Sequence, residues 1–97
     1  MIYACIMDYG DKAEIQRVRP KHRAYQLNLI GEGKVISAGT LLQPDDGGLF
    51  LYEASSLEAA QKMVDDDPYI LEGCITRHRL REYEIHGANG ALLRKTG

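Results

Sequence analysis

One histidine in the chain stands where it could take part in acid–base chemistry. His22 follows Pro20 in the stretch "RPKHRAY" at positions 19–25. Proline suits the first position of a helix, because its missing N–H would have no partner there, so we expect a helix over residues 20–30. His22 would then lie in the first turn, where the positive end of the helix dipole disfavours an imidazolium ion. A neutral imidazole can act as a general base near physiological pH.

Such a base needs a neighbour that holds its tautomer, and a carboxylate is the usual one. The candidate carboxylates are those of Asp8, Asp11, Asp45, Asp46, Asp65, Asp66 and Asp67. Asp67 stands directly before Pro68, at the end of a second predicted helix, where acidic side chains oppose the helix dipole. Locally unfavourable placement is expected where function overrides stability, so we pair Asp67 with His22 as the candidate catalytic residues. In the alternative, Asp67 only begins a turn.

Three further residues are candidate substrate contacts. Arg19 could bind an anionic substrate, Ser37 could donate a hydrogen bond into a pocket, and Tyr69 could line that pocket. Each also has an ordinary explanation, as a solvated arginine, a packed strand serine and a tyrosine at a helix end. Cys5 and Cys74 lie in apolar stretches and are interpreted as reduced, buried thiols. Without a CxxC motif or a Cys/His cluster, we expect neither a metal nor a cofactor.

The elements that must position these residues follow the order βαββαβ. The apolar patterns predict strands at residues 2–7, 34–42, 49–54 and 74–85, and helices at residues 20–30 and 56–65. Ala24, Leu27 and Ile30 give the first helix an apolar stripe at helical spacing. Ser55 and Glu58 fit a capping box at the start of the second helix.

This order is that of an α+β, ferredoxin-like fold, in which two helices cover one face of a four-stranded antiparallel sheet. The helices run roughly antiparallel, so the start of the first lies near the end of the second, and His22 can meet Asp67. A bare sheet face should be polar at every second residue, but three of the four strands are apolar on both faces. We expect a second copy to cover the other face, giving a two-fold dimer with a barrel-like interior. In the alternative, the C-terminal tail fills this face, but the tail is short and rich in glycine.

Length and charge exclude several classes of protein. The 97 residues fit one domain, which we place at residues 1–86, followed by a tail at residues 87–97. The tail could return as an edge strand after a turn at Asn89–Gly90, or it could be a flexible end. With a net charge of −2 the chain has no basic surplus, so we expect no nucleic-acid partner. No apolar run reaches the length of a membrane span, and the first residues lack the basic region of a signal peptide, so we expect a cytoplasmic protein.

Four short motifs in this order resemble the YCII-related family of small bacterial proteins. They are "RPKH" at 19–22, "SAG" at 37–39, "SLEAA" at 56–60 and "DPYI" at 67–70. The resemblance covers residues 1–85 and implies a dimeric α/β barrel with a His–Asp pair at its active site. These motifs map the pair onto His22 and Asp67, and the family implies lyase- or isomerase-type chemistry on small, often aromatic, molecules. The chain departs from the family at Thr40, where a proline is frequent, and beyond Ile85.

The residues favour one function and leave others open. In the first hypothesis His22 is the general base or acid, Asp67 orients it, and proton abstraction leads to elimination or isomerisation. A His–Asp pair without a nucleophilic Ser or Cys suits proton transfer better than acyl transfer. In the alternatives, the protein is a non-catalytic ligand-binding or regulatory dimer, or the pair only clamps two helix ends. A cleft that reaches the pair would favour function, and a sealed pair would favour the clamp.

Overall fold

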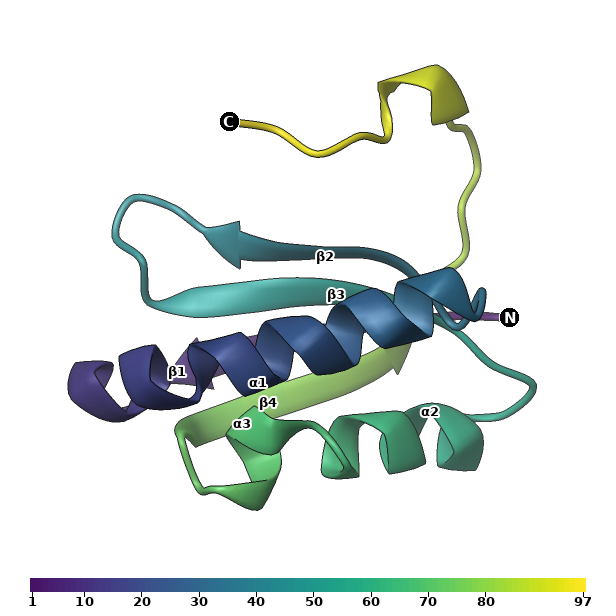
Figure 1. Cartoon of the computed structure of the whole chain (residues 1–97). Helices are drawn as coiled ribbons and strands as arrows, with labels where there is room; N and C mark the ends of the chain where they lie inside the picture. Colours follow the sequence, from purple (N-terminus) through teal and green to yellow (C-terminus); the bar gives the residue numbers. More distant parts are fainter.

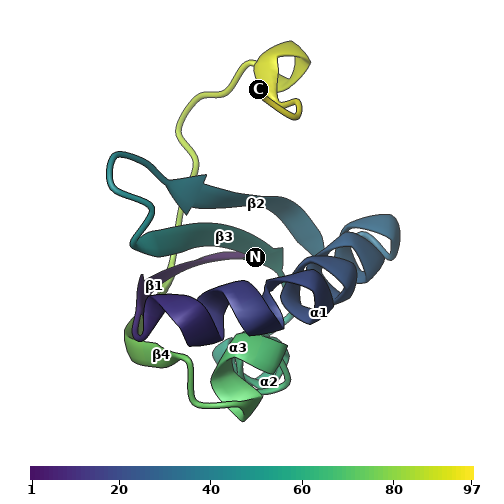
Figure 2. The same cartoon turned by 60° about the vertical axis from the view of Figure 1, so that its left-hand side comes forward.

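The computed structural model describes all 97 residues and arranges them as one antiparallel sheet with helices on one side (Figures 1 and 2). Its elements are β1 (Ile2–Tyr9), α1 (Lys12–Gly31), β2 (Val35–Leu41), β3 (Gly47–Glu53), α2 (Leu57–Asp65), α3 (Pro68–Leu71), β4 (Ile75–Glu82) and a 3-10 turn, η1 (Gly90–Leu92). The strand order is β2–β3–β1–β4, and every neighbouring pair is antiparallel. The predicted ferredoxin-like fold is confirmed.

Helix α1 begins eight residues earlier than the sequence pattern predicted, at Lys12 instead of residue 20. The side chain of Asp11 caps it by accepting a hydrogen bond of 3.1 Å from the backbone N–H of Glu14. Pro20 therefore lies inside the helix, and His22 lies far from the first turn. The prediction took the proline as a start signal, but an acidic N-cap with a glutamate three residues later is the stronger signal here.

The buried side of α1 is not the apolar stripe that the sequence indicated. Ala24, Leu27 and Ile30 are exposed. The buried residues are Ile15, Val18, His22, Gln26 and Leu29. Two of these five positions hold polar side chains, and this interrupts the apolar periodicity from which such a face is usually recognised.

The segment after β3 contains two helices where one was predicted. Helix α2 is capped by Ser56, whose hydroxyl accepts from the backbone N–H of Ala59 at 3.1 Å, and not by Ser55. The short helix α3 follows directly, with Asp67 as its N-cap and Pro68 at its first position. Asp67 thus begins one helix, although the sequence analysis placed it at the end of another.

The two faces of the sheet differ. The face toward the helices carries the core, with Tyr3, Cys5, Met7, Val35, Phe50 and Tyr52 all buried. The opposite face, here called the open face, carries the alternate residues of the same strands. Its apolar members are Ile2, Ala4, Ile6, Leu41, Leu49 and Leu51. Arg77, Arg79 and Arg81 of β4 flank them.

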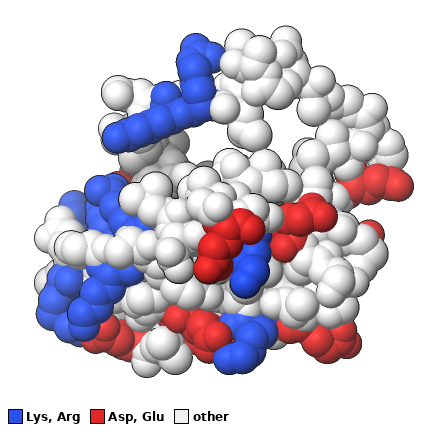
Figure 3. Space-filling view, turned by 45° about the vertical axis from the view of Figure 1, so that its right-hand side comes forward, with Lys and Arg blue, Asp and Glu red and all other residues white.

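The C-terminal tail leaves the sheet after β4 and stands off from the rest of the chain (Figures 1 and 3). It forms the η1 turn and pairs with no strand. Leu92 and Leu93 are 65% and 57% exposed, so the tail does not bury its apolar residues on the open face. On the side drawn in Figure 3, the sheet and helices below the tail carry both acidic and basic side chains. None of the helices combines the length and the apolar character needed to cross a membrane.

Candidate active site

His22 and Asp67 meet in the interior between α1 and the start of α3. The Nδ1 atom of His22 lies 2.8 and 3.0 Å from the two carboxylate oxygens of Asp67. The His22 side chain is 7% exposed and that of Asp67 is fully buried. In the tautomer that donates Nδ1–H to the carboxylate, Nε2 carries the free lone pair. The contact expected from the sequence is present.

The route by which the fold makes this contact differs from the expected one. His22 lies in the middle of α1, so the dipole at the helix start does not act on it. Its ring is oriented by Asp67 instead. The carboxylate is in turn held by the cap of α3, because Pro68 starts that helix and the backbone N–H of Tyr69 donates to Asp67 Oδ1 at 2.9 Å.

Gln26, one turn beyond His22, completes the surroundings of Asp67. Its Nε2 donates to Asp67 Oδ2 at 3.0 Å and to the hydroxyl of Tyr52 at 3.2 Å. Three donors from α1 and α3 therefore converge on one buried carboxylate. Sequence reasoning missed Gln26, although its position four residues after His22 on the same helix face was an available signal.

Two aromatic rings fix the plane of the imidazole. Tyr69 stacks on His22 with ring centroids 3.9 Å apart and planes 12° apart, and Phe50 meets it edge-on at 5.2 Å. Gln26 Oε1 is the one sealed side-chain polar atom without a partner. His22 Nε2 has no protein partner either, but it is not among the sealed atoms. The free nitrogen is therefore the atom through which His22 can meet another molecule.

Arg19 connects this group to the loop between β2 and β3. Its two terminal nitrogens each donate to one oxygen of Asp45 at 3.1 Å, and its Nε donates to the hydroxyl of Tyr69 at 3.1 Å. The structure thus brings together Arg19, Tyr69, His22 and Asp67. Asp45, which the sequence offered as a partner for His22, pairs with Arg19. Ser37 lies apart from them in one chain, because it pairs with Leu51 on the open face.

The other titratable groups near the pair are unsuited to act as bases. Burial raises the pKa of the Cys5 thiol to about 12, and the charge of Asp67 adds to this. Burial likewise raises the pKa of the Tyr52 hydroxyl and brings that of Tyr9 to about 12. These groups stay protonated near neutral pH. No group of three or more His, Cys, Asp or Glu side chains is placed to hold a metal ion.

The two best-defined of the four cavities on the chain are lined by neither His22 nor Asp67. The first, of about 360 Å³, lies along α2. The second, of about 200 Å³, lies beside Tyr9, Ile15, Arg19 and Asp45. Arg19 is the residue that this second cavity shares with the group around His22.

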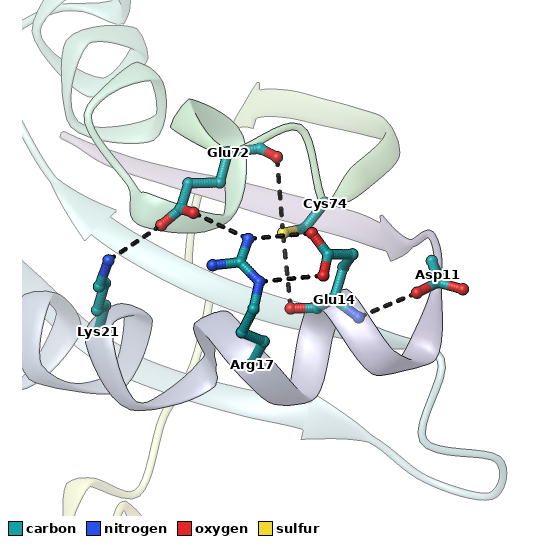
Figure 4. A network of polar contacts seen from close by, with 6 residues as sticks. All are labelled: Asp11, Glu14, Arg17, Lys21, Glu72 and Cys74. Carbon is teal, nitrogen blue, oxygen red and sulfur yellow. Dashed lines mark hydrogen bonds and ion pairs between the residues drawn. The ribbon is translucent and has the colours of Figure 1, made fainter.

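A second charged group also joins α1 to α3, on the outside of the molecule (Figure 4). Arg17 contacts Glu14 and Glu72 at 3.0 Å each, and Lys21 contacts Glu72 at 3.4 Å. These four side chains, the outer ion network, lie beside Cys74. The Cys74 thiol is 3.9 Å from the carbonyl oxygen of Glu14 and 4.0 Å from that of Glu72.

Sequence comparison places this chain among known proteins. A model of the YCII-related domain matches residues 1–84. The protein YciI of Escherichia coli O6:H1 is 36% identical over 83 residues, which cover 75% of this chain and 83% of that protein. The YciI protein of Shigella flexneri gives the same values.

Solved structures share the fold. The 5-chloro-2-hydroxyhydroquinone dehydrochlorinase of Burkholderia phenoliruptrix AC1100, solved in complex with 2,5-dihydroxybenzoquinone, superposes with a TM-score of 0.78 at 20% identity. The match covers 90% of this chain and 96% of that one. An antibiotic biosynthesis monooxygenase superposes with a TM-score of 0.55 at 13% identity, covering 88% of this chain and all of that one.

Proposed function

This chain belongs to the YCII-related family, and on that premise we propose that it is an enzyme that transfers a proton on a small molecule through His22 and Asp67. Nε2 of His22 takes a proton from the substrate, and Asp67 holds the ring and stabilises the imidazolium that forms. The electron pair left on the substrate forms a double bond as a leaving group departs, or the proton returns at another atom. The reaction is thus of lyase or isomerase type.

One observation carries this proposal: a buried carboxylate fixes Nδ1, while Nε2 has no protein partner. A positioned acid–base group contributes about 10² to 10⁴ in rate. The dehydrochlorinase with the same fold removes a leaving group from a small aromatic substrate, as its name states, which supports an elimination. Its identity of 20% is too low to carry its substrate over to this chain.

We further propose that the working form is a homodimer through the open face. Ile2, Ala4, Ile6 and Leu51 are half-buried in one chain, and Leu49 is 39% exposed. No other element of the chain covers them, and an apolar patch of this kind marks an interaction site. A second copy would bury it by isologous contact.

The dimer is tested by light scattering after size-exclusion chromatography. Ile6→Glu should convert the dimer to a monomer, because it places a charge at the centre of the open face. Leu27→Glu is the matched control, since Leu27 is 67% exposed on α1, away from the sheet. A monomeric wild-type protein would refute the dimer.

The enzymatic role is tested by a thermal-shift screen of a metabolite library, followed by mass spectrometry of each stabilising compound. A substrate should stabilise the wild-type protein and be converted by it, while His22→Asn should reduce conversion by about 10² or more. Conversion that survives His22→Asn would overturn the role of His22.

The burial of the pair, which lines neither of the two cavities described above, favours the clamp among the competing functions. The other competing function is a non-catalytic ligand-binding dimer. In that case a compound should stabilise the wild-type protein and be recovered unchanged. If the pair is only a clamp, His22→Ala should lower the melting temperature and leave ligand binding as it was.

A further inference from the structure

We propose that the Arg19 guanidinium is the binding site for a carboxylate of the substrate, and that the Asp45 side chain occupies this site in the free protein. The substrate class is therefore a small carboxylate. This inference rests on the proposed function, because it names the substrate of the same site.

The geometry of the Arg19–Asp45 contact is that of ligand recognition. Both terminal nitrogens of Arg19 donate in parallel to the two oxygens of one carboxylate, at 3.1 Å each. Such bidentate pairs combine strength with fixed orientation, and the planar fork of arginine is suited to a carboxylate. The third donor, Nε, is bound to Tyr69 and fixes the guanidinium plane.

Asp45 can leave without disturbing the fold. It lies in the loop at residues 42–46 between β2 and β3, and its side chain is 36% exposed. The loop is anchored separately, because the backbone N–H of Tyr9 donates to the carbonyl oxygen of Asp46 at 2.9 Å. A rotamer change of Asp45 alone therefore frees the fork of Arg19, whose side chain is 19% exposed.

The position of Arg19 links this site to His22. The two residues are three apart on α1, so their Cβ atoms lie about 5–6 Å from each other on one face. Tyr69 joins them, since its hydroxyl accepts from Arg19 and its ring stacks on the imidazole. A carboxylate held by Arg19 is thus connected to the imidazole through Tyr69, while the cavity that receives it is not itself lined by His22.

The space around the fork favours a small monoanion. The cavity beside Arg19 measures about 200 Å³, below the range of roughly 300–1,000 Å³ usual for ligand pockets. Departure of the Asp45 side chain would enlarge it. Asp46 lines the same cavity and would repel a dianionic phosphate more strongly than a carboxylate.

The test uses benzoate as the probe and benzamide as its neutral counterpart, with dissociation constants measured by NMR titration. Asp45→Asn removes the internal competitor, so benzoate should bind about tenfold more tightly than to the wild-type protein. Benzamide should bind both proteins equally weakly. Arg19→Gln, placed on the Asp45→Asn background, should abolish the gain.

Asp46→Asn is the matched control, because it makes the same charge change in the same loop and cavity. An equal gain in both variants would mean that general electrostatics attracts benzoate, and the inference would fail. It would fail as well if Asp45→Asn bound benzoate no better than the wild-type protein.

The benzoate-binding results can be distinguished from a test of proton transfer by His22. Binding at Arg19 does not require proton transfer, so His22→Asn should keep the affinity for benzoate. If Asp45→Asn leaves the affinity for benzoate unchanged while His22→Asn abolishes turnover, the proposed carboxylate site is wrong and the proposed enzymatic role is supported. The reverse result would keep the binding site and remove the enzymatic role.

Discussion

The same two helices, α1 and α3, are joined twice by charged side chains, once inside the molecule and once outside. Inside, His22 meets Asp67 at 2.8 Å, with side chains 7% and 0% exposed. Outside, Arg17 meets Glu72 at 3.0 Å, with side chains 52% and 29% exposed. The distances are nearly equal, but the surroundings are not. Water screens the outer pair, while the inner pair has only its protein partners.

This difference shows that a short contact does not by itself measure importance. Exposed ion pairs add little to stability, since much of their attraction is lost to solvent and to side-chain ordering. A buried charge must have all its hydrogen bonds, because nothing replaces a missing partner. We therefore expect substitutions of the buried residues around Asp67 to cost more stability than substitutions in the outer ion network.

The largest loss of stability is expected from removal of Asp67, the carboxylate on which the buried hydrogen bonds converge. Asp67→Ala removes the acceptor of three hydrogen bonds and the cap of α3, so the free energy of unfolding should fall by about 3–5 kcal/mol. Urea unfolding followed by circular dichroism at neutral pH measures this. Asp66→Ala is the control, since its neighbouring carboxylate is 47% exposed. Equal losses of unfolding free energy in Asp67→Ala and Asp66→Ala would contradict the proposed difference between buried and exposed carboxylates.

A smaller loss is expected from Gln26→Leu, which removes one donor to Asp67. The lost hydrogen bond to a charged group is partly offset, because the unpartnered Gln26 Oε1 disappears with it. The net loss in the free energy of unfolding should be about 1 kcal/mol. Gln61→Leu makes the same replacement at a half-buried position on α2, where the lost hydrogen bond to Asp65 is exposed, and should have a much smaller effect. A stabilised Gln26→Leu would show that the orphaned oxygen costs more than the donor contributes.

Disruption of the outer ion network should change the access of a thiol reagent to Cys74 more than it changes the free energy of unfolding. Burial raises the pKa of both thiols, that of Cys5 to about 12, so both should react slowly with a thiol reagent. Cys74 lies beside this network and Cys5 does not, so Arg17→Ala should raise the labelling rate of Cys74 several-fold, measured by peptide mass spectrometry, while that of Cys5 stays constant. Equal acceleration at both cysteines would indicate global unfolding and contradict this prediction.

The smallest effect concerns Glu72 and its dependence on pH. Hydrogen bonding to Arg17 lowers the pKa of Glu72 below its usual value of 4.5. Ionised Glu72 therefore stabilises the fold above that value, and the contribution is lost as the pH falls through the lower folded pKa. Glu72→Gln should be slightly less stable than the wild-type protein at neutral pH and equal to it in strong acid. Thermal unfolding at both pH values measures the difference, which added salt should reduce. A difference that persists in acid would mean that the glutamine disturbs packing instead.

The sequence predicted the order of the elements and the contact between His22 and Asp67, since both follow from strand and helix patterns and from chain topology. It misplaced the start of α1, because Pro20 is tolerated inside a helix whose cap is Asp11. It also chose the exposed side of α1 as the buried one, because His22 and Gln26 occupy core positions. The pairing of Arg19 with Asp45 could not be predicted, since it depends on the path of a loop and not on any periodic pattern. The catalytic roles of His22 and Asp67 and the substrate contacts of Arg19, Ser37 and Tyr69 remain predictions.

The arginines of β4 have a consequence for how the sheet can grow. Strand β4 is one edge of the sheet and carries Arg77, Arg79 and Arg81, and charged side chains on an edge strand oppose pairing with a further strand. The other edge, β2, is irregular between Val35 and Ser37, which also hinders strand addition. Both ends of the hydrogen-bonded ladder are thereby closed to extension. A chain with an exposed apolar sheet face is thus protected from edge-to-edge aggregation, and association is directed to the face.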